Sequence, residues 1–393
     1  MDRKLATIRK VASVEAHDNA DRLEIAIVDG WRCIVNKEEG IKAGDLVCYI
    51  EVDSIVPDIP YFAFMKTRRF HVRTIKLRGQ ISQGLVVSND KLPVVGYELY
   101  KKHHFCFVEP KEGKDLTDDL GIKKYIPVSE RTPIGTSPKN HGKIHKYMTR
   151  FQWYRKLTHS KSKSFPSFIP KTDEERIQNC AWTLKDKEGI YYVTEKLDGQ
   201  SSTFAWKKSW WGGDFYVCSR NVLMFELDGS NWSKMAKELN IKDTLKKIGK
   251  NIAIQGEIVG EGIQGNKYNL TGRKLFLYNV WDIDKQRYYT YNELVGFCWK
   301  YDFEKVPTLN ERYTLPDTVD EMVEFSQGMS QLNASVKREG VVVRHTGKRR
   351  WLSRPQVIKD RVDYITYEDA TNPSKRKSFK AINPLFLLEH DDY

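Results

Sequence analysis

Residues 195–199 read Glu195-Lys196-Leu197-Asp198-Gly199 and close an apolar run, Tyr191–Glu195, that predicts a β-strand. A lysine at the end of a strand can act as a nucleophile when its pKa falls below the free value of about 10.4. A glycine three residues later allows the backbone to approach a nucleotide closely. Taken alone, however, the pattern K-x-D-G favours a surface turn, so its meaning depends on the rest of the chain.

Five further polar elements follow at the ends of predicted strands or within them. They are Ser219-Arg220-Asn221, Gln255–Gln264 with Glu257, Leu275–Val280 with Tyr278, Arg338–Arg344 with Glu339, and Lys377–Asn383 with Lys380. Each has an ordinary structural explanation, because a tyrosine is often a core aromatic and a strand-end glutamate or lysine is often a solvated surface group. The six elements in this order are hard to attribute to chance.

As a set, these elements resemble the conserved motifs I to V of the covalent nucleotidyltransferase superfamily, which comprises RNA ligases, DNA ligases and mRNA capping enzymes. The resemblance spans about residues 171–383. It implies an α+β domain with ATP-grasp-like antiparallel sheets and helices, and a reaction through a lysyl-nucleotide. No Walker-type G-x-x-x-x-G-K-[ST] motif supports a P-loop NTPase instead.

The strand and helix pattern of residues 171–393 agrees with such a domain. Apolar and β-branched runs at Ser202–Trp206, Phe215–Cys218 and Ile252–Glu257 predict strands. Helical spacing extends over Trp232–Ile248 and over Thr318–Leu332. We therefore expect antiparallel sheets accompanied by a few helices.

The first part of the chain, residues 1–110, reads as short strands separated by Gly, Asp and Pro, such as Leu23–Val28 and Trp31–Val35. Such a series predicts a small β-barrel, with the OB-fold as the leading candidate. The runs His17–Glu24 and Gly40–Val47 resemble OB modules that bind tRNA or other RNA. We expect an OB-like β-barrel that binds RNA.

Between the two parts, residues 111–170 are expected to form a basic linker rich in aromatic residues. Ten Lys and Arg and no Asp or Glu occur from Arg131 to Lys171, with six aromatic side chains among them. A solvated linker would explain the charge, but disordered linkers seldom contain so many aromatics. Positive charge for a phosphate backbone and rings for bases favour contact with nucleic acid.

The order of the domains favours one branch of the superfamily. DNA ligases and capping enzymes carry an OB domain after motif V, whereas the residues after Lys380 are too few for any domain. The runs Gly256–Asn266 and Phe165–Arg176 are similar to RNA ligases. The whole arrangement is similar to the Deinococcus/Naegleria-type RNA ligases, which have an N-terminal OB module.

This resemblance implies an ATP-dependent RNA ligase that joins 3′-OH and 5′-phosphate RNA ends through lysyl-AMP and RNA-adenylate intermediates, in RNA repair. Lys196 would accept the AMP, and Lys380, Glu339 and Glu257 would be the other catalytic residues. Glu339 and Glu257 would hold Mg²⁺ or Mn²⁺, partly through water. The nucleotide contacts implied are Glu195, Lys196, Asp198, Gly199, Arg220, Asn221, Glu257, Tyr278 and Lys380, with Arg176 and Lys171 from the linker side.

The electrostatics of such a site lead to further expectations. Lys380, Arg220 and a divalent cation would depress the pKa of Lys196, since like charges disfavour the protonated amine. Tyr278 would stack on adenine. Motif V usually has Lys-x-Lys, whereas this chain has Ser378-Phe379-Lys380 with Lys377 one position earlier. Which group meets the leaving pyrophosphate is therefore open.

Composition limits the class of protein and of partner. Hydrophobic residues make up 40% and aromatics 12%, which excludes a wholly disordered chain. A net charge of +13, from 65 Lys and Arg against 52 Asp and Glu, favours a polyanionic partner. No run approaches the ~18 apolar residues of a membrane span. Six cysteines without a C-x-x-C pair predict free thiols in a reducing compartment, and hence an intracellular protein in the cytoplasm, the nucleus or a host cell.

Two other classes stay open beside the RNA ligase, which we expect to be a monomer acting on nicked duplex RNA. One is a DNA ligase or a GTP-dependent capping-type nucleotidyltransferase. The other is a non-catalytic RNA-binding protein whose motifs have decayed. Intact Lys196, Glu257, Glu339 and Lys380 weigh against decay, because a protein that only binds RNA does not need them.

Overall fold

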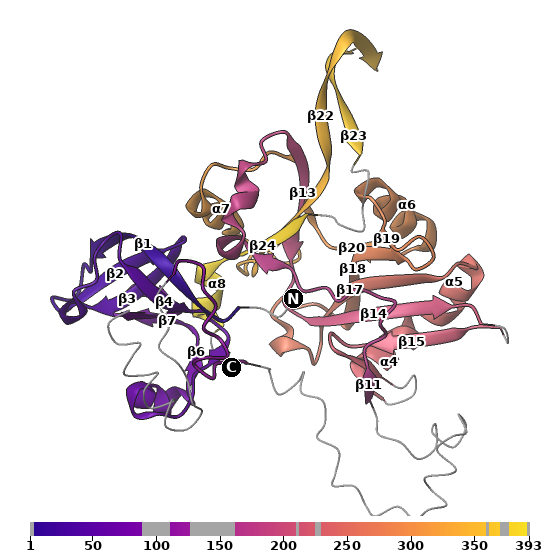
Figure 1. Cartoon of the computed structure of the whole chain (residues 1–393). Coiled ribbons are helices and arrows are strands. Elements are labelled where there is room, and N and C mark those ends of the chain that lie inside the picture. Colours follow the sequence, from indigo (N-terminus) through magenta and orange to yellow (C-terminus); the bar gives the residue numbers. More distant parts are fainter. Residues whose placement is uncertain are drawn as a thin grey trace, which may run out of the picture.

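The computed structural model describes residues 4–88, 111–125, 162–209, 212–224, 229–358, 361–369 and 377–390. Figure 1 shows antiparallel sheets in both parts of the chain, with the N-terminal part in indigo and purple and helices packed around the later sheets. The α+β class predicted from the sequence is confirmed. No helix in the described residues is long and apolar enough to cross a membrane.

The N-terminal part is a curled sheet whose strand order is β3-β2-β1-β4-β9. Its longest strand pairs with β2 through its second half and with β4 through its first half, and the register shifts between Val11 and Ser13. A bulge at that point bends the strand, so that its first half pairs with β4 and its second half with β2. The bounds are β1 Ala6–Ala16, β2 Leu23–Val28, β3 Trp31–Asn36, β4 Leu46–Ile50 and β9 Leu85–Ser88.

Shorter elements cover this sheet. A small sheet has the order β10-β5-β6, and β7 pairs with β8 as a hairpin. Residues 111–125, which the sequence analysis assigned to the linker, pack in the N-terminal core through Leu116, Leu120 and Ile122. The bounds are η1 Lys37–Glu39, β5 Ser54–Ile55, η2 Pro60–Arg68, β6 His71–Val72, β7 Thr74–Leu77, β8 Gln80–Gln83 and β10 Lys123–Lys124.

Most of the expected linker, from residue 126 to residue 161, lies outside the described residues, including four of the six aromatics between Arg131 and Lys171. The other two, Phe165 and Phe168, pack against a core cluster that contains Ile169 and Trp281. The Phe168 carbonyl also accepts a hydrogen bond from the Trp281 indole N–H, at 3.1 Å. These two partly buried rings therefore help to pack the C-terminal part of the chain.

One C-terminal sheet has the order β11-β16-β15-β14-β17-β18-β19, with β20 parallel to β18. Its apolar face packs on helices α4, α5 and α6. The strands are β11 Ser162–Ser164, β14 Gln200–Lys207, β15 Asp214–Cys218, β16 Val222–Met224, β17 Ile252–Gly260, β18 Arg273–Asp282, β19 Arg287–Tyr288 and β20 Glu304–Lys305.

The other C-terminal sheet has the order β12-β24-β22-β13-β21, and β23 pairs with β22 as a ribbon that projects from the sheet (Figure 1). Its core lies under α7 and the short helices η5 and η6. The elements are β12 Glu175–Arg176, η5 Ile177–Asn179, η6 Ala181–Lys185, β13 Gly189–Lys196, β21 Thr308–Tyr313, β22 Gly340–Ile358, β23 Arg361–Asp369 and β24 Ser378–Ile382.

The helices differ from two sequence predictions. The run Trp232–Ile248 is not one helix, because Asn240 has a left-handed φ of 47° and separates α4 from α5. The helix predicted over Thr318–Leu332 ends at Ser326. The bounds are α4 Asn231–Glu238, α5 Ile241–Ile248, η7 Gln264–Asn266, α6 Tyr291–Tyr301, α7 Val319–Ser326 and α8 Pro384–Glu389.

The connection between β13 and β14 positions the catalytic candidates. β13 belongs to one C-terminal sheet and β14 to the other, and only residues 197–199 separate them. Lys196 therefore stands at the point where the chain passes from sheet to sheet. Side chains that reach this point from the ends of β17 and β22 belong to different sheets as well.

Candidate active site

Lys196 and Glu339 are brought together by strand register. β13 and β22 are antiparallel and Lys196 pairs with Gly340, so the end of β13 meets the start of β22. The Lys196 ammonium donates a hydrogen bond to Glu339 Oε1 at 2.5 Å. Both side chains are mostly buried. The nucleophile and one carboxylate predicted from the sequence are therefore direct partners.

Glu257 joins this cluster from the other sheet, where it pairs with Ser201 near the start of β14. Burial raises the pKa of Glu257 to about 8, and Lys196 and Arg220 only partly oppose this rise. Glu339 also has a raised pKa, again first because of burial. Two buried carboxyl groups thus share one lysine.

The pKa of Lys196 has the opposite direction from the sequence-based expectation. Burial alone would lower it, but Glu339, Glu257 and Asp198 outweigh burial and raise it above the usual lysine value. We expected Lys380, Arg220 and a divalent cation together to depress this pKa; without the cation, the three carboxyl groups prevail. Lys196 keeps its proton in this arrangement and has no lone pair for attack.

The carboxylates beside Lys196 have the chemistry of a divalent-cation site. Glu339 Oε2 is buried and has no hydrogen-bond partner among the described residues. Two half-buried carboxyl groups, one with an unsatisfied oxygen, suit Mg²⁺ or Mn²⁺, which favour oxygen ligands and would displace a proton from a carboxyl group. No group of three or more potential metal ligands occurs in the described part of the chain. Water or phosphate oxygens would have to complete the coordination, as is usual for Mg²⁺.

The turn after Lys196 is held by a segment that the sequence analysis did not single out. The Asp198 carboxylate forms an ion pair with Lys267, and the Asp198 backbone N–H donates to Tyr268 Oη at 2.8 Å. A Cβ on Gly199 would lie 2.4 Å from the Ile258 carbonyl oxygen. The close approach to β17 is therefore one reason why this position requires glycine. The expected approach of this backbone to a nucleotide stays a prediction.

A second charged cluster surrounds Asp173, just upstream of β12. Its carboxylate accepts hydrogen bonds from Lys380 at 3.3 Å, Arg220 at 2.8 Å and Lys124 at 3.2 Å. Burial would raise the pKa of Asp173, but these three cations hold it well below its usual range. Burial, aided by neighbouring cations, lowers the pKa of Lys380 to about 8. Three cations converge here on a single anion, an arrangement that suits phosphate oxygens.

In the altered motif V, Lys377 and Ser378 have different hydrogen-bond partners. Lys377 donates to Asp186 at 2.8 Å, and Ser378 donates to Glu174. Alternate residues of a strand share a face, so Ser378 and Lys380 point the same way and Lys377 points to the other side. Lys377 therefore does not replace the lysine that the motif usually has at the position of Ser378.

Tyr278, which the sequence predicts to stack on adenine, has its hydroxyl and one ring face in contact with neighbouring side chains. Tyr278 Oη bonds to Ser201 at 3.0 Å and to Thr172 at 3.2 Å, and the Arg344 guanidinium carbon lies 5.7 Å from the centre of its ring. One face of the ring is thus covered by a cation. Because burial raises the pKa of Tyr278 to about 12, its hydroxyl keeps its proton at neutral pH.

Four predicted nucleotide contacts are not joined to Lys196 by any contact among the described residues. Glu195 points away from the site, where it accepts the Gln331 N–H at 2.8 Å. Arg176 pairs with Asp53 at 3.1 Å and lies over the Trp31 ring at 5.6 Å, so it connects the N-terminal part to the C-terminal part. Lys171 is exposed, and Asn221 lies in the turn between β15 and β16.

Two family models match parts of the chain, and solved structures match it along its whole length. A family model described as an OB-fold domain matches residues 5–89, and one described as RNA ligase matches residues 189–359. The structure of Naegleria gruberi RNA ligase with PPi is 30% identical, with a TM-score of 0.73 and 100% of each chain covered. A mutant of that ligase with ATP and Mn is 29% identical, with a TM-score of 0.74, covering 99% of this chain and 100% of that chain.

The chain belongs to the RNA ligase family. Its N-terminal part is an OB-fold domain, and its C-terminal sheets form the RNA ligase nucleotidyltransferase domain. It is an RNA ligase enzyme. No curated protein matches the sequence.

Several residues of this candidate site were missed by sequence reasoning. Asp173 and Glu174 lie in a loop without periodicity, and Lys267 and Tyr268 follow a glycine-rich run as ordinary surface-type residues. Only Arg344 left a signal, because an arginine ending the apolar run of β22 needs a counter-ion when buried. It is 3% exposed and lies 3.4 Å from Glu174.

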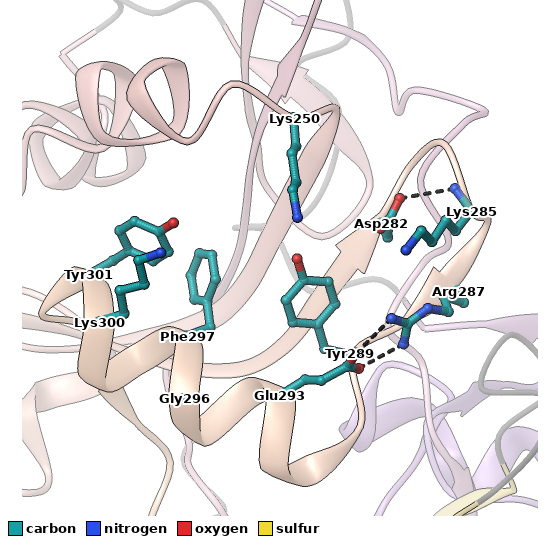
Figure 2. A pocket seen from close by; sticks show the side chains of 10 residues that line it. All are labelled: Lys250, Asp282, Lys285, Arg287, Tyr289, Glu293, Gly296, Phe297, Lys300 and Tyr301. Carbon is teal, nitrogen blue, oxygen red and sulfur yellow. Dashed lines mark hydrogen bonds and ion pairs between the residues drawn. The ribbon is translucent and has the colours of Figure 1, made fainter.

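A hollow beside α6 lies apart from this catalytic cluster. Figure 2 shows basic side chains of Lys250, Lys285 and Lys300 around the rings of Tyr289 and Tyr301. The Arg287 guanidinium in the same hollow forms two hydrogen bonds with Glu293, at 2.6 and 2.7 Å. None of the predicted catalytic residues lines this hollow.

Proposed function

We propose that this RNA ligase uses ATP to join 3′-OH and 5′-phosphate RNA ends through lysyl-AMP and RNA-adenylate intermediates, in RNA repair. The observation that carries the proposal is the position of Lys196, 2.5 Å from Glu339 and beside the buried Glu257. Structures of Naegleria gruberi RNA ligase with ATP and Mn, with AMP and Mn, and with PPi support ATP and a divalent cation as its cofactors.

The reaction consists of three displacements at phosphorus. Neutral Lys196 attacks the α-phosphorus of ATP, an N–P bond forms, and the bond to pyrophosphate breaks. A 5′-phosphate oxygen of the RNA then displaces Lys196 and takes the AMP. Finally a 3′-OH attacks the 5′-phosphorus, loses its proton and releases AMP. Because each step is an in-line displacement, catalysis consists mainly of positioning and charge neutralisation.

Glu339 and Glu257 are the residues that would hold Mg²⁺ or Mn²⁺. The cation supplies positive charge that offsets these carboxylates, lowers the pKa of Lys196 and neutralises phosphate oxygens. Glu339 also accepts a hydrogen bond from the Lys196 ammonium, so it orients the amine toward the site. The raised pKa of Lys196 makes this charge compensation necessary before attack.

The cations around Asp173 are suited to the leaving group. Lys380 and Arg220 would exchange the Asp173 carboxylate for phosphate oxygens of ATP, and Tyr278 would stack on adenine. We further propose a monomer that acts on nicked duplex RNA inside a cell. The buried, unpaired thiols of all five described cysteines agree with a reducing compartment.

The test begins with protein stripped by pyrophosphate and mixed with Mg²⁺ and α-labelled ATP or GTP. Intact mass and label are read on the denatured protein. We expect one AMP per chain, no adduct in Lys196→Ala, and a full adduct in Lys185→Ala, an exposed lysine on η6. A nicked RNA duplex with a labelled 5′-phosphate should then give RNA-adenylate and sealed product. A GMP adduct, or an AMP adduct on Lys196→Ala, would contradict the proposal.

A further inference from the structure

One segment of the OB-fold domain has positive charge without any acidic residue. Residues 59–88 contain no Asp or Glu, although the chain as a whole has 52 of them. The segment forms η2, β6, the hairpin β7–β8 and β9. Its six cations are Lys66, Arg68, Arg69, Arg73, Lys76 and Arg78. Four of them, Lys66, Arg69, Lys76 and Arg78, are exposed.

The backbone of this segment is unusual in a second way. Eleven non-glycine residues of the described chain have a positive φ, and eight of these are Asp, Asn or Gln. The other three are Arg69 at 52°, Phe70 at 59° and Arg78 at 46°, and all three lie in this segment. A side chain of this kind is disfavoured in the left-handed region, where glycine fits without strain.

Arg78 occupies the tip of the hairpin between β7 and β8. Leu77 pairs with Gln80, so Arg78 and Gly79 form a two-residue turn, and both have positive φ. Asn-Gly is the favoured pair in such a turn. The arginine side chain makes no ion pair within the described part of the chain. Its presence is therefore not explained by folding.

Arg69, at the end of η2, is a second exposed arginine in the left-handed conformation. It is the C-cap residue in the left-handed conformation, and its N–H donates a hydrogen bond to the Lys66 carbonyl at 3.0 Å. Glycine is the usual residue where a helix ends in this conformation. Phe62 and Met65 anchor η2 in the core, while Phe64 is 61% exposed. The helix thus presents an aromatic ring and cations on a fixed support.

The segment is connected to the catalytic turn by α8. β7 contacts α8, which Figure 1 shows in yellow beside the N-terminal domain. The Phe386 ring of α8 lies 4.9 Å from the Lys267 ammonium, and Lys267 pairs with Asp198. RNA ends held at Lys196 would therefore have the OB-fold segment on one side of them.

We propose that Lys66, Arg69, Lys76 and Arg78 bind the phosphate backbone of the RNA that flanks the ends to be joined, and that Phe64 stacks on a base. This inference rests on the proposed function, because it requires RNA at Lys196. From Arg69 to Arg78 the chain spans at most about 30 Å, enough to follow several phosphates. The positive charge of a segment that itself contains no Asp or Glu matches a polyanion, and this role would explain why arginines occupy strained positions.

The decisive variants are Arg69→Gly and Arg78→Gly, because glycine removes the charge and relieves the backbone at once. Binding of a nicked RNA duplex without ATP is measured over a range of salt concentrations. We expect Kd to rise about 3- to 10-fold for each variant, and the slope of log Kd against log salt to fall by about 1. The melting temperature should stay equal or rise, and lysyl-AMP formation should be unchanged. Phe64→Ala should raise Kd about 5-fold or more.

The control is Gln286→Gly, which relieves a φ of 50° in an exposed turn without removing charge. It should leave Kd and the salt slope unchanged. Unchanged RNA binding in both arginine variants would overturn the inference, and so would a fall in melting temperature that accounts for weaker binding. If the unmodified chain binds RNA through these arginines but forms no lysyl-AMP, the proposed function fails and this surface stands.

Discussion

The Nζ atom of Lys196 lies 2.5 Å from Oε1 of Glu339, although the two residues are 143 positions apart in the sequence. The pairing of β13 with β22 creates this contact, because Lys196 is opposite Gly340. The same carboxylate that orients the amine also raises its pKa. The chain therefore holds the proposed nucleophile in place and protonated, and we expect it to become reactive only when positive charge compensates the carboxyl groups.

Glu339→Gln tests that relationship with little change of shape. The variant loses one carboxylate beside Lys196, so we expect lysyl-AMP to form about 100-fold more slowly and to require more Mg²⁺. The initial rate of adduct formation against Mg²⁺ concentration measures both effects. Glu261→Gln, an exposed neighbour of β17, is the matched control and should behave as the unmodified enzyme does. An unchanged Mg²⁺ dependence in Glu339→Gln would exclude a cation at this carboxylate.

Asp173→Asn removes the carboxylate on which Lys380, Arg220 and Lys124 converge. We expect the free energy of unfolding to fall by about 1–2 kcal/mol, because three cations lose their counter-ion at a site that water partly reaches. Pyrophosphate should restore the lost stability, since it supplies negative charge at the same place. Urea denaturation with and without pyrophosphate measures this, with exposed Asp118→Asn as the control. Equal stabilisation of variant and unmodified enzyme by pyrophosphate would refute the prediction.

Tyr268→Phe removes the acceptor of the Asp198 backbone N–H at 2.8 Å. The tyrosine is buried, so the unpaired N–H should cost about 1–2 kcal/mol. We expect lysyl-AMP formation to slow about 5- to 10-fold at saturating ATP, with a nearly unchanged KM, because the turn after Lys196 loses its support. Single-turnover rates across ATP concentrations separate the two parameters. Tyr216→Phe serves as the control, and a rise in KM alone would show that Tyr268 acts on nucleotide binding.

The sequence predicted elements well where hydrophobicity alternates with a single period. Leu23–Val28 was predicted with its observed bounds, and Phe215–Cys218 differs from β15 by one residue. The strand β1 was missed because it contains Arg9, Lys10 and Glu15, whose charges hide the apolar side. The break at Asn240 was missed because helical spacing continues from α4 into α5 with no change of period.

The candidate site likewise contains residues that the sequence predicted and residues that it did not. Lys196, Glu257, Glu339 and Lys380 were singled out because each belongs to a motif of the superfamily that the sequence resembles. Asp173 and Lys267 were not found, since a loop residue gains its role only from what the fold brings against it. The raised pKa of Lys196 in the protein without a cation was not foreseen either, because it depends on the balance between three carboxyl groups and burial, and a linear sequence contains no distances.

Glu257→Gln tests the raised pKa of Glu257 through the pH dependence of the free energy of unfolding. Burial raises the pKa of Glu257 from its ordinary 4.5 to about 8, so the folded chain binds this proton more tightly than the unfolded chain. The stabilising contribution of the protonated group is complete below pH 4.5 and is lost as pH rises through about 8. The free energy of unfolding of Glu257→Gln, relative to that of the unmodified enzyme, should therefore rise by at least about 1 kcal/mol between pH 5 and 8. Above pH 8 this difference should not increase further. Urea denaturation from pH 5 to 9 measures the difference, which added Mg²⁺ should reduce. A difference that stays constant across this range would show that Glu257 ionises normally.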